Sequence, residues 1–173
     1  MLTRKKVIPF VSLVLLIGVL FLIIGTPGYQ SIRIKNRDFV SLENKLKEVV
    51  NTNTKIDIKE LSDFVWDECY VFNPYYPPEA IYKKVGTEWT TARTYIGYLL
   101  FHNMENKTVN DEQFIIVFKK SNKVILSAKY SLNQLPVIFK LDNYKFTSDN
   151  SKFIVSVAKQ YDEGKIKELS LKK

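Results

Sequence analysis

Residues 64–89 read FVWDECYVFNPYYPPEAIYKKVGTEW, and this stretch holds most of the local structural signals of the chain. Every second residue from Phe64 to Phe72 would point to the same face of an extended strand, which puts four aromatic residues and Glu68 together. Aromatic and β-branched residues favour a pleated, half-buried surface. The pattern therefore predicts a strand whose two faces differ; the second face carries Val65, Asp67, Cys69 and Val71.

The residues after this strand predict a turn and a short helix. Proline has no N–H to donate to a sheet and disfavours helix at the residue before it, so Asn73-Pro74 ends the strand. A helix can begin at Pro78, because a missing N–H costs nothing at the first helical position. Gly86 suits a left-handed C-terminal cap, so we expect a helix from Pro78 to Val85.

The corner between this strand and this helix is a candidate binding surface. Its adjacent tyrosines and prolines form a rigid aromatic surface of the kind that docks a peptide or a glycan. The alternative is that the tyrosines cover the edge of the core, since large aromatic side chains mostly serve burial. The candidate binding residues are Trp66, Asp67, Tyr75, Tyr76 and Pro77.

The N-terminus predicts a membrane segment. Residues 7–25 are uncharged and almost wholly apolar, and as a helix they would rise about 28 Å, close to the hydrocarbon thickness of a bilayer. The run is longer than that of most cleavable signals, and no Ala-x-Ala-like site follows it. We therefore expect residues 1–27 to be an uncleaved signal-anchor, with a cleavable secretory signal as the alternative.

The charges next to this segment predict its orientation. Arg4, Lys5 and Lys6 lie directly before it, whereas residues 26–31 on its other side carry no charge. Basic residues favour the cytoplasmic side. We expect the chain to cross the cell membrane once. Its N-terminus would lie on the cytoplasmic side (inside), and the bulk of the chain would be extracytoplasmic.

A juxtamembrane linker and an amphipathic helix are expected over residues 28–55. Leu42, Leu46, Val49 and Val50 recur at helical spacing, and charged residues occupy the positions between them. We expect this helix to span residues 39–50 and to pack on a sheet or to continue as a stalk.

The rest of the chain predicts an extracytoplasmic domain over residues 56–160. Its apolar runs suggest strands at residues 95–102, 114–119, 123–130, 137–141 and 153–157. Ser121-Asn122 suits a two-residue hairpin turn between the second and third of these. The order of elements predicts an α+β fold with an antiparallel sheet of about four to six strands, covered by one or two helices. Residues 161–173 read as a charged tail, and a frayed terminal helix is expected over residues 159–173.

A spaced motif links the chain to a group of proteins. The pattern is Phe64-x-Trp66-Asp67-x-x-Tyr70-x-Phe72-x-Pro74-Tyr75, then Pro78-x-x-Ile81 and Gly86-x-x-Trp89. It resembles that of uncharacterised small lipoproteins and single-pass membrane proteins of Firmicute-type bacteria, over roughly residues 56–130. The chain lacks the lipid-accepting cysteine of the lipoprotein members, so the resemblance implies anchoring by the hydrophobic helix. It implies no activity and assigns no functional residue.

Composition argues against several classes of chemistry. The chain has one histidine and one cysteine, so a catalytic triad or dyad would have to use His102, and a zinc site would lack ligands. Cys69 suits a small buried side chain. No glycine-rich phosphate loop occurs. We expect no cofactor and no metal.

Carboxylates are the remaining candidates for chemistry. Asp57, Glu60, Asp63, Asp67 and Glu68 lie close together in sequence. A hydrolase would need two carboxylates at a defined separation in a cleft, and a solvated acidic face is the simpler interpretation. We expect Asp67 to fix the strand by a hydrogen bond to backbone donors or by a salt bridge.

These observations predict a non-enzymatic, membrane-anchored domain that binds a protein or an envelope component. An envelope hydrolase using carboxylates near Asp67, and a structural subunit of a membrane complex, are the alternatives. The net charge of +8 includes three membrane-flanking basic residues, so we expect no nucleic-acid partner. Twelve lysines against five acidic residues in 113–173 suit an anionic envelope component instead.

Overall fold

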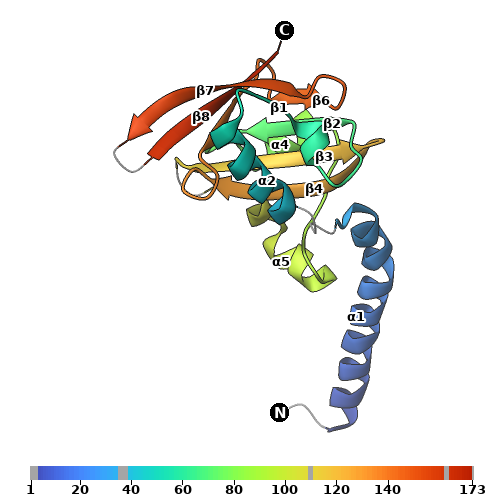
Figure 1. The fold of residues 1–173 in the computed structure, drawn as a ribbon. Coiled ribbons are helices and arrows are strands. Elements are labelled where there is room, and N and C mark those ends of the chain that lie inside the picture. Colours follow the sequence, from blue (N-terminus) through green and yellow to red (C-terminus); the bar gives the residue numbers. More distant parts are fainter. Residues whose placement is uncertain (1–3, 35–38, 109–110, 162–163, 173) are drawn as a thin grey trace.

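A long N-terminal helix, α1 (Arg4–Ile32), projects away from the rest of the chain (Figure 1). The computed structural model describes residues 4–34, 39–108, 111–161 and 164–172. Within them, Ser12–Ile32 is long and apolar enough to cross a membrane. The helix contains the predicted apolar segment and continues beyond it, so residues 28–32 are helical rather than the expected linker. Residues 35–38 of that linker lie outside the described residues.

The domain after α1 contains four further helices and eight strands in the described part of the chain. In chain order these are α2 (Phe39–Thr52), β1 (Lys55–Asp57), α3 (Ile58–Leu61), β2 (Glu68–Phe72), α4 (Pro78–Val85), α5 (Tyr95–Glu105), β3 (Gln113–Lys120), β4 (Lys123–Ser131), β5 (Val137–Lys140), β6 (Lys145–Thr147), β7 (Lys152–Tyr161) and β8 (Gly164–Leu171). The predicted α+β class is confirmed.

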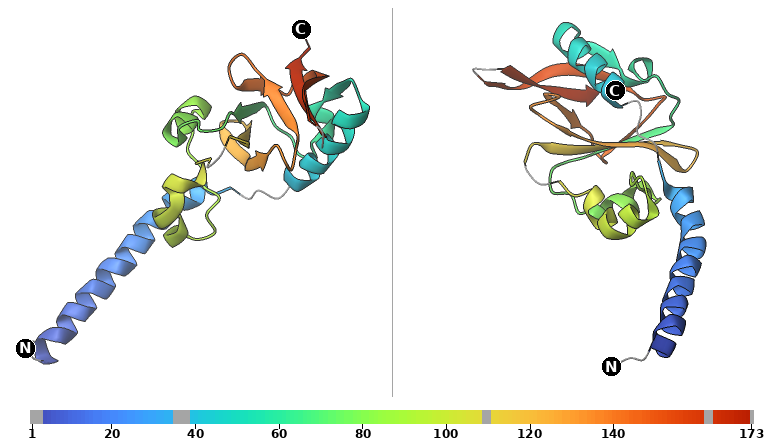
Figure 2. Two further views of the ribbon diagram at one scale, coloured as in Figure 1. Left: turned by 90° about the vertical axis from the view of Figure 1, so that its left-hand side faces the viewer. Right: turned by 90° about the horizontal axis from the view of Figure 1, so that it is seen from below.

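The described strands form two four-stranded sheets instead of the single sheet expected. The β2 sheet has the order β4-β3-β2-β6 and is antiparallel throughout. The β7 sheet has the order β1-β7-β8-β5, in which the β5–β8 pair is parallel. Figure 2 shows three layers: α2 with the β7 sheet, the β2 sheet, and then α4 and α5.

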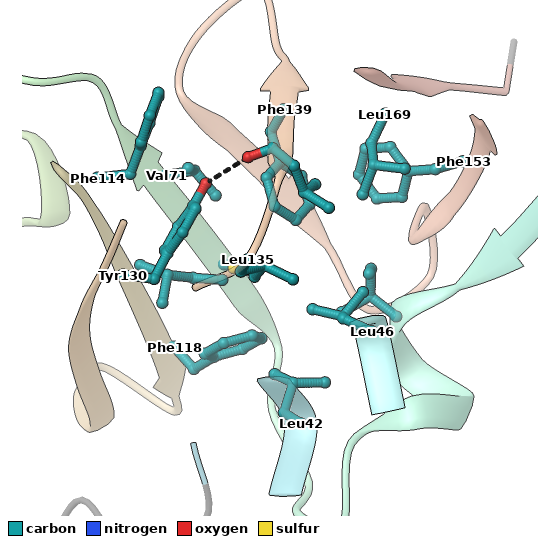
Figure 3. Packing of buried hydrophobic residues seen from close by; sticks show 14 of the residues in the cluster. Leu42, Leu46, Val71, Phe114, Phe118, Tyr130, Leu135, Phe139, Phe153 and Leu169 are labelled. Carbon is teal, nitrogen blue, oxygen red and sulfur yellow. Dashed lines mark hydrogen bonds between the residues drawn. The ribbon is translucent and has the colours of Figure 1, made fainter. Parts of the chain in front are cut away.

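The main core fills the space between the two sheets. Leu42 and Leu46 reach into it from α2 (Figure 3), and with Val50 they confirm the predicted amphipathic helix. The Tyr130 hydroxyl donates a hydrogen bond of 3.4 Å to the carbonyl of Val137, which joins β4 to β5 across this core. Burial raises the pKa of Tyr130.

A second core lies on the other face of the β2 sheet, beneath α4. It consists of Tyr70, Phe72, Ile81, Val85, Trp89, Ile115, Val117 and Val124. Strand β2 therefore has a core on each side, because Cys69 and Val71 belong to the main core. The expectation of a half-buried strand is wrong at this point, since β2 lies between β3 and β6 with side chains packed on both faces.

The predicted strand also begins later than expected. Residues 64–67 precede β2 and do not continue its alternation. Trp66 packs against Phe118 and Phe146 in the main core, on the side opposite to Tyr70 and Phe72. The loop before Glu68 turns the indole ring of Trp66 to the opposite face, the one on which strand periodicity would place Val65 and Asp67.

Two local predictions are confirmed by backbone geometry. Helix α4 has the predicted bounds, and Gly86 caps it with φ of 77° in the left-handed region. Ser121 and Asn122 both have positive φ, at 45° and 64°, as a two-residue hairpin turn between β3 and β4 requires.

Two other predictions are wrong. Residues 95–102 belong to α5 and not to a strand. The expected C-terminal helix is instead the end of β7 together with strand β8. These two strands form an antiparallel hairpin, in which Phe153 pairs with Leu171 at one end and Tyr161 pairs with Gly164 at the other. Strand β8 also pairs with β5, so residues 164–171 belong to the β7 sheet; residues 162, 163 and 173 lie outside the described residues.

An ion cluster ties β2 to its neighbouring strands. The Glu68 carboxylate lies 3.3 Å from the Nζ atom of Lys119 on β3 and also forms a salt bridge with Lys145 on β6. Lys119 is buried and donates a 2.8 Å hydrogen bond to the carbonyl of Val85 at the end of α4. The hydrogen bond from Lys145 holds the pKa of Glu68 below its usual value.

Replacing Glu68 with Gln should lower the free energy of unfolding at pH 7 by about 1–2 kcal/mol, because it removes the counter-charge of the buried Lys119 ammonium. The folded-state pKa of Glu68 lies below the unfolded-state value. Its stabilisation is therefore complete above the unfolded-state pKa and is lost as the pH falls through the folded-state pKa. Urea unfolding of the full chain in detergent, repeated at decreasing pH, measures both effects.

Glu60→Gln is the matched control, because Glu60 is an exposed carboxylate on α3. It should change the free energy of unfolding by less than about 0.5 kcal/mol. A Glu68→Gln chain as stable as wild type at pH 7, or a deficit that does not shrink in acid, would contradict this role for the ion cluster.

Candidate functional site

The five candidate binding residues do not form one surface. Trp66 is buried in the main core, and its Nε1 donates a 2.8 Å hydrogen bond to the hydroxyl of Ser62. Packing explains its position, because only 3% of its surface remains exposed. Asp67 and the segment Tyr75–Pro77 lie at opposite ends of β2.

Asp67 stabilises the β3–β4 hairpin. Its Oδ2 atom accepts a 2.7 Å hydrogen bond from the backbone N–H of Ser121, the first residue of the turn. Its own N–H and C=O bond to Lys119 and Ser148, at 2.8 and 3.0 Å. The side chain is exposed, and it bonds to a backbone donor as expected.

The segment Tyr75–Pro77 forms an exposed corner next to α4. Tyr75 is 61% exposed and has φ of 60°, in a region that bulky residues rarely adopt. Its N–H donates a 2.7 Å hydrogen bond to the hydroxyl of Thr108. Its phenol is hydrogen-bonded to Asp111, which raises the pKa of Tyr75. Contacts from distant segments therefore hold this residue in a strained conformation.

Tyr76 has a different role from Tyr75. Its ring lies 4.9 Å from that of Phe72 and 5.1 Å from that of Tyr144, measured between centroids, and it covers the edge of the second core. Pro77 is exposed and precedes the first residue of α4. Each interpretation of the corner therefore fits one of the two adjacent tyrosines. Tyr76 covers the edge of the core, whereas Tyr75 points to solvent and is available for binding.

An open pocket of about 330 Å³ lies beside this corner. It is lined by Pro78, Glu79, Tyr82, Glu88 and His102. Two carboxylates and two aromatic rings make this lining suitable for a cationic group, through ion pairing and cation–π contact. His102 donates from Nε2 to Glu88 at 2.8 Å, and its ring stacks on that of Tyr82.

The described residues include no metal-binding cluster, and their one cysteine is buried. They contain no cluster of three or more His, Cys, Asp or Glu side chains able to hold a metal ion. Cys69 is fully buried, and burial raises the pKa of its thiol well above the usual value, which makes it unreactive.

Four of the five clustered acidic residues, all but the exposed Glu60, have structural partners in the described part of the chain. Asp57 caps α3 and accepts a hydrogen bond from Ser151, and Asp63 accepts hydrogen bonds from Ser41 and Lys45. A second open pocket, of about 410 Å³, is lined by residues 59 and 62–66 and does not include Asp67. Neither of these two pockets places Asp67 beside a second carboxylate, so neither supports the hydrolase hypothesis.

Thr90 joins α1 to the domain. Its N–H donates to the carbonyl of Ile32 at 3.0 Å, and its C=O accepts from the N–H of Ile34 at 2.9 Å. The Thr90 hydroxyl donates to Glu105 at the end of α5, and the Tyr29 hydroxyl donates to the carbonyl of Ala92 at 2.7 Å. Thr90 is fully buried, so α1, α5 and the segment after Trp89 form one continuous packed unit.

Neither this junction nor α5 was predicted from the sequence. Residues 95–102 are a short apolar run, which periodicity alone cannot assign to helix or strand. The available signal was Thr94, whose hydroxyl accepts a 3.0 Å hydrogen bond from the N–H of Gly97 and caps α5. Polar and aromatic side chains at Tyr98, His102 and Glu105 also follow a helical period.

Replacing Asp67 with Ala should lower the free energy of unfolding by about 1 kcal/mol, because the N–H of Ser121 loses its acceptor. Asp67→Asn keeps a side-chain oxygen in the same place and should cost clearly less. Chemical denaturation of both variants measures the difference. Equal losses in the two variants would show that the negative charge, and not the acceptor geometry, is what the hairpin requires.

The chain matches no model of a protein family, no curated protein and no solved structure. Its function is therefore inferred from its own residues and geometry: an apolar helix joined to an α+β domain, with an exposed aromatic corner beside an acidic pocket.

Proposed function

We propose that the chain is a single-pass membrane protein whose domain lies outside the cytoplasm. Helix α1 supports this placement, because it carries an apolar run of membrane-spanning length with Arg4, Lys5 and Lys6 at its start. The absence of a small-residue cleavage site in the sequence favours an uncleaved anchor in the cell membrane, with the N-terminus inside.

The domain binds a protein or envelope component without catalysis, and the corner surface of Tyr75 and Pro77 makes the contact. One observation carries this proposal: Tyr75 is an exposed aromatic residue held at positive φ by Thr108 and Asp111. Strained residues that the surrounding structure holds in place are concentrated at binding and catalytic sites. An exposed tyrosine also offers a large contact area at a low cost in conformational entropy.

The acidic pocket beside the corner favours a protein partner with a basic side chain. Glu79 and Glu88 supply negative charge, and the rings of Tyr82 and His102 supply flat surfaces. A lysine or arginine side chain fits this lining by charge and by cation–π contact. An anionic envelope polymer would meet two carboxylates of the same sign at this position, which is unfavourable.

A photo-crosslinking amino acid at position 75 tests this proposal in intact membranes. It should give an adduct of discrete mass, because the side chain at this position points toward the partner. Glu79→Lys in the same chain should abolish the adduct by placing a positive charge beside the basic group. Glu60→Lys, a charge reversal at an exposed site on α3, should leave the adduct unchanged. Gel analysis of the affinity-tagged chain measures the yields.

The same crosslinker at Val65 is the negative control, because Val65 is 68% exposed and lies in the loop before β2. Equal adducts from positions 65 and 75, or none from position 75, would contradict a partner at the corner. Tyr75→Gly separates binding from folding. Glycine tolerates positive φ, so the free energy of unfolding should change by less than about 1 kcal/mol while partner capture falls.

A further inference from the structure

Helix α5 presents its apolar side to the outside of the domain. Its exposed side chains are Ile96, Leu99, Leu100, Phe101 and Met104, which are between 47% and 67% exposed. At 100° per residue these positions cover about 200° of the helix circumference. A surface helix of a water-soluble domain has the opposite arrangement, with its apolar stripe turned to the core.

The polar side of α5 is the side that contacts the domain. The hydroxyl of Tyr98 and Nε2 of His102 both bond to Glu88, at 3.3 and 2.8 Å. Glu105 accepts hydrogen bonds from the Thr90 hydroxyl at 2.5 Å and from a backbone N–H at 3.0 Å. Directional polar bonds therefore fix which face of α5 is turned outward.

The first turn of α5 lies against α1 at the end of its apolar run (Figures 1 and 2). The ring of Tyr95 packs 6.0 Å from that of Phe21 and 5.8 Å from that of Tyr29, between centroids. Gly25 lies directly beneath the phenol of Tyr95, where a Cβ atom would overlap the ring. Gly25 is also the last residue of the apolar segment 7–25, so α5 lies beside the end of that segment.

Exposed basic residues lie at both ends of α5 and at the end of α1. Arg93 is exposed just before the helix, and Lys107 is exposed just after it. Arg33 is exposed at the end of α1, with its guanidinium 5.9 Å from the ring centroid of Tyr29. Tyrosines and cationic side chains at this depth are typical of the layer between lipid tails and headgroups.

We propose that α5 is an interfacial helix, lying in the headgroup layer of the leaflet from which the domain projects, with its apolar face in the acyl chains. The proposal rests on the membrane anchoring of α1 in the proposed function. The lipid surface is the occupant that the geometry favours, because α1 carries the apolar face of α5 to the edge of the bilayer. The breadth of that face also exceeds the narrow stripe that packs against one partner helix.

The consequence is a domain with a fixed orientation on the membrane. The junction at Thr90 restrains the domain relative to α1, and contact of α5 with lipid supplies a second attachment beside the first. The pocket lined by Glu79, Glu88 and His102 is then held close to the membrane surface, because His102 belongs to α5 itself.

Spin labelling of the full chain in nanodiscs of phosphatidylcholine and phosphatidylglycerol tests the proposal. A nitroxide is attached to Leu100→Cys, and electron paramagnetic resonance measures its accessibility to two reagents. Oxygen concentrates in lipid tails, whereas a polar nickel chelate stays in water. The buried native Cys69 leaves the introduced thiol as the reactive one. Leu16→Cys on α1 is the lipid reference, and Val65→Cys is the water reference; both positions are more than half exposed.

The oxygen-to-nickel accessibility ratio at position 100 should exceed that at position 65 several-fold and approach that at position 16. A ratio at position 100 equal to that at position 65, with position 16 in lipid, would overturn the interfacial helix and leave the anchor intact. A label at position 100 shielded from both reagents would mean that protein covers it, which also overturns the proposal. A label at position 16 in water would overturn the anchor and the interfacial helix together. Met104→Cys repeats the test should the first substitution disturb packing.

Discussion

The backbone pairing of Thr90 with Ile32 and Ile34 is the constraint on which the arrangement of the whole chain depends. It closes helix α1 onto the segment that follows Trp89, and the hydroxyl of Thr90 extends the same contact to the end of α5. A fully buried threonine with its polar groups bonded is costly to displace, because each group would lose its partner in a site closed to water. Helix α1 and the domain are therefore joined by packed structure at this point.

Strand β2 organises the domain in a similar way. Its register places Cys69 and Val71 in the core between the sheets and Tyr70 and Phe72 in the core beneath α4, so one strand supports both layers. Glu68 links this strand through charge to β3 and β6, and Lys119 carries the link to the end of α4. The corner at Tyr75 directly follows this strand, so its position relative to α1 depends on both the strand and the junction.

Local signals predicted the parts of this fold that local chemistry determines. Proline at the start and Gly86 at the end defined α4, helical spacing defined α2, and the Ser121-Asn122 turn defined the β3–β4 hairpin. The sequence could not show that Trp66 turns to the opposite core, or that the charged C-terminal segment pairs as β8, because both depend on contacts with distant strands. Of the candidate site, Tyr75 was predicted and the acidic pocket beside it was not, since His102 reaches that pocket only when residues 95–105 form a helix.

We propose that α1 spans the membrane and forms one continuous ordered unit with the domain. Amide hydrogen exchange of the full chain in nanodiscs measures this continuity, because exchange reports the free energy of local opening. Slow exchange is expected from Ser12 through Ile32 and at the N–H groups of Ile34 and Thr90, with protection at the last two comparable to that of Val71 in β2. Rapid exchange at Ile34 and Thr90 beside a protected apolar helix would contradict it, because the domain would then hang from the membrane on a flexible tether.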